Sequence, residues 1–353
     1  MPGNPDPAST PTLREIARRA GVSHTTISLA LRNDPVLPAK TRMRLRRLAD
    51  TMGYRPNVLV SALMTQVRMR HPRRTTEVIG FLTGGPTPED WRGHSAMAGF
   101  HLGAMERAKD LGMQLEPFWL GGDGVRTREV CRILRTRSIR GNLIAPFPVP
   151  NYPQQLDWAQ LVCVALGYAF PAQSLHRATH HHFRGSLCAV EHLRTLGYRR
   201  IGFMLEESEN QRVGYAWLGG YLAGRLTFGG APLEPLFTPA QPDLAGVRRW
   251  LRRERPDVVL GFGPRQAAAL EAAGCRIPRD IAFAALDVQQ ARLAGRADMS
   301  GIDQNLPLIG ATAVDILAGR LYHNEHGLPP RPVLSMVEGF WVAGKTAPAL
   351  FRP

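Results

Sequence analysis

The sequence predicts a small all-α head at the N-terminus and a larger α/β core behind it. The chain has 353 residues, more than one hydrophobic core usually holds, so two or three folding units are expected. Between residues 12 and 53, short amphipathic helices with capping signals follow one another. From residue 77 onward, apolar runs of strand length alternate with helical patterns, which predicts parallel sheets with helices on both faces.

The composition excludes a membrane protein. Hydrophobic residues make up 44% of the chain, and no apolar run approaches the roughly 18 residues of a membrane span. Residues 1–11 hold four prolines and no basic or apolar segment, so they predict a disordered tail rather than a secretory signal, and a cytoplasmic protein. The four cysteines form no CxxC pair, which favours reduced thiols over a disulfide framework or a zinc site.

Positive charge is concentrated at the N-terminus. Residues 1–74 contain fourteen Lys or Arg against four Asp or Glu, an excess of ten out of the net charge of +15. This concentration is typical of a surface that contacts phosphates, while a solvated basic face is the alternative that charge alone leaves open.

The first helix has clear boundaries. Thr12 precedes Glu15 by three residues, the spacing of a capping box, and Gly21 supplies the left-handed residue that ends a helix. Between them, the apolar residues that recur at helical spacing are Leu13, Ile16, Ala17 and Ala20.

Two more helices complete the head. Ser23 can cap a second helix over residues 24–31, in which Ile27 and Leu31 are the expected buried positions. The short turn between the first two helices predicts a helix-turn-helix. A third helix, from Ala39 to about Met52, is expected to close the small core with Met43, Leu45, Leu48, Ala49 and Met52.

These motifs lie in the run TLREIARRAGVSHTTISLALRNDPVLPAKTRMRLRRLADTMGYRPNVLVSAL, residues 12–63, which resembles the DNA-binding head and hinge of the lactose-repressor/galactose-repressor (LacI/GalR) family. The matching residues are Thr12, Ile16, Ala17, Ala20, Gly21, Val22, Ser23, Thr26, Ser28, Lys40, Thr41, Arg42, Gly53, Tyr54, Pro56, Asn57 and Leu63. The resemblance implies that the second helix enters the major groove of double-stranded DNA.

The resemblance also implies which residues contact DNA. The base-reading positions are His24, Thr25 and Leu29. The residues suited to phosphate contacts are Thr12, Ser23, Thr26, Ser28, Arg32, Asn33, Lys40, Thr41, Arg42 and Tyr54. Leu29 replaces a polar residue common at its site, so contact with a thymine methyl and a silent or core-directed side chain both stay open. Pro38 replaces the usual cap of the third helix.

Residues 57–63 are too short to form a stable helix alone. By the resemblance, they form a hinge helix that folds in the minor groove, with Asn57 at its start and with Val60 and Leu63 as a wedge on one face. A plain linker is the alternative. The expected domains are a tail (1–11), a helix-turn-helix head (12–56), a hinge helix and linker (57–76) and a core (77–353).

The resemblance continues through the core at lower identity, in GYRRIGF (197–203), RDIAFAALD (279–287) and IDQNLPLIGATAVDIL (302–317). It implies a periplasmic-binding-protein-like α/β core of two doubly wound subdomains. The chain would cross between them near residues 196, 303 and 333, with a ligand in the cleft between the subdomains. The expected subdomains are 77–195 with 304–332, and 196–303 with 333–353.

Five residues are candidates for effector binding by that likeness. Asp287 would hold ligand hydroxyls, unless it only caps a turn; Arg212 and Trp217 lie in the segment that supplies ligand-binding arginine and aromatic groups. Trp91 and Arg92 follow the first strand, and both tryptophans could stack on a ligand or pack in the core.

Three departures weaken a sugar-binding interpretation: His181-His182, Gln211-Arg212 and Gly263-Pro264 stand where the family usually has other residues. The adjacent histidines 180–182 cannot all face one ion, so no metal and no cofactor are expected.

The preferred function is a DNA-binding transcriptional regulator, a repressor, that binds a near-palindromic operator as a homodimer and responds to a small-molecule, carbohydrate-like effector. A tetramer stays open. The first alternative is an effector-blind or partner-protein-controlled DNA-binding protein. The second is an enzyme with a recruiting head, although the sequence holds no GxSxG, Walker or HExxH motif.

Overall fold

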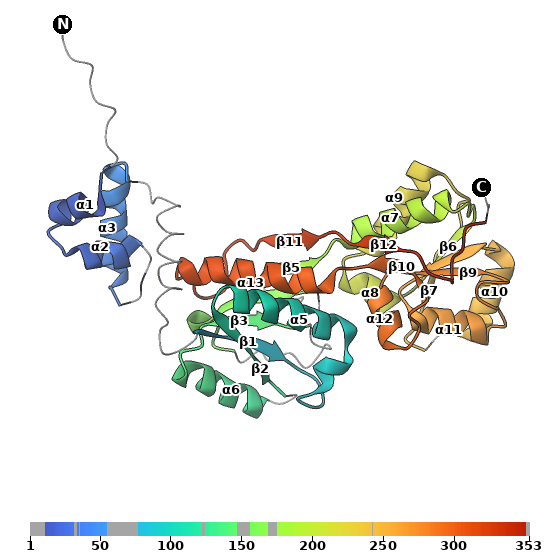
Figure 1. Ribbon diagram of the computed structural model, residues 1–353, viewed down its shortest axis with the longest axis horizontal. Coiled ribbons are helices and arrows are strands. Elements are labelled where there is room, and N and C mark those ends of the chain that lie inside the picture. The colour runs from blue at the N-terminus through green and yellow to red at the C-terminus, as the bar shows by residue number, and fades with distance from the viewer. Residues whose placement is uncertain are drawn as a thin grey trace, which may run out of the picture.

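The computed structural model describes residues 11–31, 34, 36–54, 77–121, 124–146, 156–168, 175–241 and 243–350. The expected tail, apart from residue 11, and the expected hinge and linker at 57–76 lie outside the described residues. Figure 1 shows the helical head in blue and a core with two α/β parts, which we call the N-subdomain and the C-subdomain.

The head is the expected three-helix unit. Its helices are α1 (Leu13–Ala20), α2 (His24–Leu31) and α3 (Ala39–Thr51). Its fully buried residues are Ile16, Ala17, Ile27, Ala30, Leu45 and Ala49. One expected core position was wrong: Met43 is 58% exposed, because it lies on the outer face of α3. Leu31 is half-buried and packs against the core, while Ala30 is the second fully buried residue of α2.

The N-subdomain is built on a six-stranded parallel sheet with the order β11-β5-β4-β3-β1-β2. Its strands are β1 (Glu77–Thr83), β2 (Met113–Trp119), β3 (Gly141–Ile144), β4 (Val162–Leu166), β5 (His176–His180) and β11 (Leu334–Val337). Its helices are η1 (Asp90–Gly93), α5 (Ser95–Asp110), α6 (Gly124–Thr136), η2 (Trp158–Gln160) and α13 (Leu306–Tyr322).

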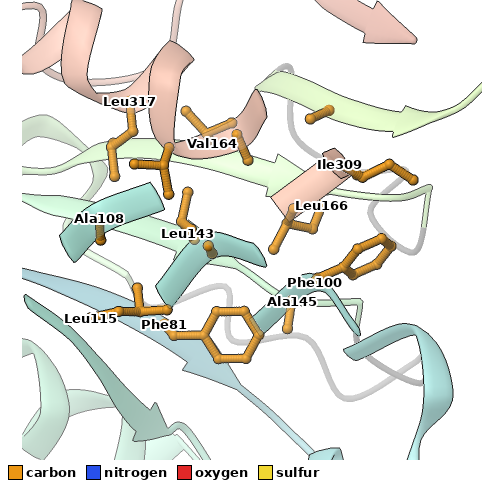
Figure 2. Packing of buried hydrophobic residues seen from close by; sticks show 14 of the residues in the cluster. Phe81, Phe100, Ala108, Leu115, Leu143, Ala145, Val164, Leu166, Ile309 and Leu317 are labelled. Carbon is orange, nitrogen blue, oxygen red and sulfur yellow. The ribbon is translucent and has the colours of Figure 1, made fainter. Parts of the chain in front are cut away.

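Helices α5 and α13 cover one face of this sheet and cross each other closely (Figure 1). Glycine makes this approach possible, since a Cβ at Gly103 would lie 1.8 Å from the carbonyl oxygen of Pro307. Beneath the two helices, Phe81, Leu143 and Val164 of the strands pack against Ile309 and other buried residues of the helices (Figure 2).

The C-subdomain has a second six-stranded sheet, with the order β12-β10-β9-β8-β6-β7, in which only β12 runs antiparallel to its neighbour. Its strands are β6 (Ile201–Glu206), β7 (Leu236–Thr238), β8 (Val258–Gly261), β9 (Ala282–Ala285), β10 (Ser300–Asp303) and β12 (Phe340–Val342). Its helices are α7 (His182–Thr195), α8 (Glu207–Arg212), α9 (Ala216–Phe228), α10 (Leu244–Glu254), α11 (Pro264–Ala272) and α12 (Val288–Leu293).

The chain crosses between the subdomains at residue 181, at 304–305 and at 338–339. The first crossing comes well before residue 196, because α7 packs with α9 in the hydrophobic core of the C-subdomain. The third comes after residue 333, because β11 pairs with β5 of the N-subdomain. The expected boundaries at 195/196 and 332/333 are therefore corrected to these positions.

Within the described residues, no helix is both long and apolar enough to cross a membrane. The four cysteines are free thiols.

Candidate nucleic-acid interface and effector site

The start of α1 is fixed by the capping box that the sequence predicts. The Thr12 hydroxyl accepts from the Glu15 N–H at 3.3 Å, and the Glu15 carboxylate accepts from the Thr12 N–H at 2.6 Å. This hydrogen bonding to Thr12 lowers the pKa of Glu15. Gly21 ends the helix with φ of 66° in the left-handed region, and it turns the chain toward α2.

Helix α2 presents one face to the core of the head and the opposite face to solvent. Ser23 caps it by accepting from the Thr26 N–H at 3.1 Å, while Ile27 and Ala30 are fully buried. At 100° per residue, Thr25 and Leu29 point away from those buried residues. Thr25 is exposed, and Leu29 is half-buried without belonging to the hydrophobic core of the head, which favours an outward-facing side chain over a core-directed one.

The other predicted contact residues differ in exposure. His24 and Lys40 are exposed, and Thr41 and Tyr54 are half-buried. The hydroxyls of Ser23 and Thr26 lie 2.8 Å apart. Five of the predicted residues lie outside the described part of the chain: Arg32, Asn33, Asn57, Val60 and Leu63.

Arg42 has a structural task in the head. Its guanidinium donates to the carbonyl oxygens of Leu37 at 2.5 Å and Asp34 at 3.2 Å, so it ties the connection between α2 and α3 to the third helix. Pro38 supplies no side-chain cap for α3, and this tether holds the chain at that point instead. A phosphate contact by Arg42 stays a prediction.

Aromatic and imidazole rings meet where the chain crosses between the subdomains. The ring centroid of His180, at the end of β5, lies 5.6 Å from that of Trp217 in α9 and 5.2 Å from that of His182 in α7. Burial lowers the pKa of His180 to about 4 and that of His182 well below its usual value. Both imidazoles are therefore neutral at pH 7.

Charged groups lie beside these rings. Arg212 pairs with Glu209 at 2.7 Å in α8. Burial lowers the pKa of His94, at the start of α5, and the Glu209 carboxylate opposes this shift across the subdomain boundary. Glu209 also adds to the shift at Asp287, whose pKa burial raises to about 6. Glu209 is therefore paired with Arg212 and is within electrostatic range of His94 in the N-subdomain and of Asp287.

Asp287 caps helix α12. Its Oδ1 accepts from the N–H groups of Gln289 at 3.0 Å and Gln290 at 3.2 Å, and only 3% of the residue is exposed. The cap that the sequence left as an alternative is therefore present. Ligand binding by Asp287 stays a prediction.

The two predicted stacking residues are buried. Trp91 lies in the core of the N-subdomain, edge-on to Phe81, with the Arg92 guanidinium 4.8 Å from the centre of its ring. Trp217 is fully buried in the C-subdomain. Of the five predicted effector residues, Arg212, Trp217 and Asp287 adjoin one junction, whereas Trp91 and Arg92 form a separate pair.

Sequence reasoning missed several polar side chains at this junction. In and around α7, α8 and α9, buried side-chain atoms without a hydrogen-bond partner in the described part of the chain include both ring nitrogens of His180, Oγ of Ser186, both amide atoms of Asn210, and Nε1 of Trp217. Buried polar groups are nearly always paired, so a group of unpaired ones marks a place for a ligand or ordered water. The signal in the sequence is the run His180-His181-His182, which spans the end of β5 and the start of α7.

The described residues form no group of three or more His, Cys, Asp or Glu side chains that could hold a metal ion. The junction holds unpaired polar atoms beside the rings of His180 and Trp217. Its arrangement suits binding of an organic ligand.

Comparison with known proteins assigns both parts of the chain. Residues 12–57 match the family described as bacterial regulatory proteins, lacI family, and residues 190–346 match the periplasmic binding protein-like domain. The HTH-type transcriptional regulator CelR of Thermobifida fusca is 26% identical over 325 residues, which cover 88% of this chain and 92% of CelR. The repressor PurR of Photobacterium profundum is 22% identical, over 89% of this chain and 93% of PurR.

Solved structures share the fold. A CelR–cellobiose complex superposes with a TM-score of 0.58 at 20% identity, covering 95% of this chain and 99% of the other. The lac repressor dimer bound to operator and the anti-inducer ONPF gives 0.56 at 19% identity, covering 97% and 100%.

The fold and the head define a DNA-binding transcriptional regulator with a periplasmic-binding-protein-like core, and these relatives are regulators rather than enzymes. The chain combines a lacI-family helix-turn-helix head with a periplasmic-binding-protein-like domain, as LacI/GalR-type regulators do.

Proposed function

We propose that the protein is a repressor that binds a near-palindromic operator as a homodimer in the cytoplasm. The observation that carries the proposal is the orientation of α2. Ile27 and Ala30 hold it in the core of the head, and Thr25 and Leu29 face outward with His24 exposed beside them. An exposed helix face of this kind fits the major groove, where base edges can be read.

Specific and nonspecific contacts divide between the predicted residues. His24, Thr25 and Leu29 read bases. The hydroxyl, amide and basic residues around α2 and α3 contact phosphates, which position the head without reading sequence. Val60 and Leu63 of the hinge wedge into the minor groove.

Each chain has one head, so a near-palindromic operator with two half-sites needs two chains. Two heads joined through their cores bind two half-sites, and binding of the first raises the effective concentration of the second. Support comes from the lac repressor structure, which holds a dimer on its operator.

The effector binds at the junction of the subdomains and is an uncharged, hydroxyl-bearing molecule of the carbohydrate class. Unpaired donors and acceptors on His180, Asn210 and Trp217 support hydroxyl recognition. The arginine at the site, Arg212, is already paired with Glu209, and Asp287 adds negative charge, so an anionic effector finds no free cation among these residues. The cellobiose bound to CelR supports the same class.

Effector binding changes DNA affinity by moving the subdomains against each other. The three crossing segments lie beside the effector residues, so a shift at the junction reaches the hinge through the N-subdomain. The coupling must be reciprocal and is typically about 1–3 kcal/mol.

A double variant tests the assignment of α2. In fluorescence anisotropy, H24A/T25A should lose affinity for a duplex selected by the wild-type protein and keep its affinity for an unrelated duplex, because base contacts supply the difference. R14A, at an exposed position of α1, serves as the control. An equal loss of affinity for both duplexes would show that His24 and Thr25 of α2 do not read bases.

A panel of neutral sugars, sugar phosphates and sugar acids tests the effector. A neutral sugar should shift the affinity for the selected duplex, while its phosphate and its acid should not. A shift by the anionic members alone would contradict the proposed class.

A second candidate is a DNA-binding protein without an effector or controlled by a partner protein. The burial of Trp91, which leaves no ring face for a ligand to stack on, favours it. If no member of a broad metabolite panel changes DNA affinity or thermal stability, this candidate replaces the first.

A further inference from the structure

The N-subdomain has one edge at which all its strands begin. Its six strands are parallel, and β1 starts at Glu77, directly after the connection from the head. Helix α6 joins β2 to β3, so its C-terminal end lies where β3 begins. The backbone oxygen of Arg140, just before β3, accepts from the Val162 N–H at the start of β4. We call this side of the sheet the hinge edge.

Arginine is concentrated in the segment that leads to the hinge edge. Residues 124–140 contain six arginines and one acid, a net charge of +5. Residues 1–74 account for ten of the net charge of +15, and residues 124–140 account for the other five. The rest of the core carries no net charge.

Three of these arginines have no acidic partner. Arg132, Arg135 and Arg140 are exposed, and none of them forms an ion pair within the described residues. Arg132 and Arg135 are three residues apart and share a side of α6. The neighbouring acids are already used, since Glu116 pairs with Arg137 and Glu129 pairs with Arg126, each at 2.6 Å.

We propose that Arg132, Arg135 and Arg140, the hinge-edge arginines, bind backbone phosphates of the duplex just outside the operator half-sites. The proposal rests on the proposed function, because the heads must first dock on DNA. Once they do, the chain connection brings the hinge edge toward the duplex. Its charge is complementary to phosphate. The core thereby adds affinity that is independent of sequence.

Two lengths of one duplex test the proposal. The wild-type protein first selects a site from a random pool. That site is then made as a short duplex ending at the outer limits of the half-sites, and as a long duplex extended by one helical turn on each side. The measurement is the dependence of binding on salt concentration. Each phosphate neutralised contributes about 0.9 to the slope of log affinity against log salt.

The variant R132Q/R135Q/R140Q is compared with R249Q/R252Q/K345Q. The control changes the same charge at exposed positions of the C-subdomain that form no ion pair within the described residues. The wild type and the control should show a steeper slope on the long duplex, by about 0.9 for each extra phosphate. The hinge-edge variant should lose this extra slope on the long duplex. On the short duplex its slope should equal that of the wild type and of the control variant.

A hinge-edge variant that keeps the full slope on the long duplex would overturn the proposal. So would an equal loss of slope on both duplexes, or a wild-type slope that is the same for both. If the random pool yields no enriched site, the proposed function fails first, and this outcome is distinct from the others.

Discussion

The imidazole of His180 lies 5.6 Å from the indole of Trp217, measured between ring centroids, and this contact joins strand β5 of the N-subdomain to helix α9 of the C-subdomain. Neither ring has a hydrogen-bond partner for its nitrogens within the described residues. The junction is therefore held by uncharged aromatic packing, which a proton on His180 would disturb.

Stability should fall as the pH is lowered from about 6.5 to about 4. Burial lowers the pKa of His180 to about 4 from its usual 6.5, so the unfolded chain binds the proton first in this interval. One such group contributes at most about 1.4 kcal/mol per pH unit. Asp287 acts in the opposite sense, because its pKa is raised to about 6.

Urea unfolding over this pH range, compared between the wild type and H180F, isolates the contribution of His180. The phenyl ring keeps the contact with Trp217 but cannot titrate, so the acid loss should be smaller in the variant. H323Q, at an exposed position after α13, is the control. Parallel pH profiles for wild type and H180F would contradict the assignment.

Arg42→Ala should destabilise the head by about 1.5–3 kcal/mol, since charged hydrogen bonds to two carbonyl oxygens are lost. Hydrogen exchange of the α2 and α3 amides in the full chain measures this directly. Arg44→Ala, at an exposed neighbouring position, should leave the exchange unchanged. Equal protection in both variants would show that the Arg42 tether contributes nothing.

Lys40→Ala should weaken binding to every duplex and reduce the salt slope by about 0.9, because an exposed lysine at the start of α3 is placed to neutralise one phosphate. Anisotropy titrations at several salt concentrations give the slope. Lys345→Ala in the C-subdomain should match the wild type. If the variant binds more weakly but its salt slope is unchanged, Lys40 does not neutralise a phosphate.

Gly103→Ala should destabilise the core by about 1–3 kcal/mol, because the added methyl would meet the Pro307 carbonyl and push α13 away from α5. Gly319→Ala is a matched control on α13. A Cβ there meets nothing within 4 Å, so the change should be neutral or stabilising. Thermal unfolding measures the melting temperatures of both variants. Similar melting temperatures for Gly103→Ala and Gly319→Ala would contradict the close packing of α5 and α13.

The architecture was predictable because its signals are local. The Thr12–Glu15 capping box, Gly21 and the Ser23 cap each depend on a few neighbouring residues, and all three occur as predicted. The prediction that Met43 is buried was wrong. Its spacing fits the buried stripe of α3 taken alone, but its exposure depends on where α1 and α2 pack against α3.

The effector site was harder to predict because its residues come from separate segments. His180, His182 and Trp217 come from β5, α7 and α9, and no pattern in the sequence joins these three segments. The first crossing was misplaced for the same reason. Helix α7 follows β5 directly, and only its packing with α9 assigns it to the C-subdomain.

The most direct test of the central claim is selection of DNA from a random pool by the full-length protein, followed by sequencing and by measurement of the mass of the complex. We predict enrichment of two inverted half-sites bound by two protein chains. Enrichment of one unpaired half-site bound by a single chain, or no enrichment at low salt, would contradict the account.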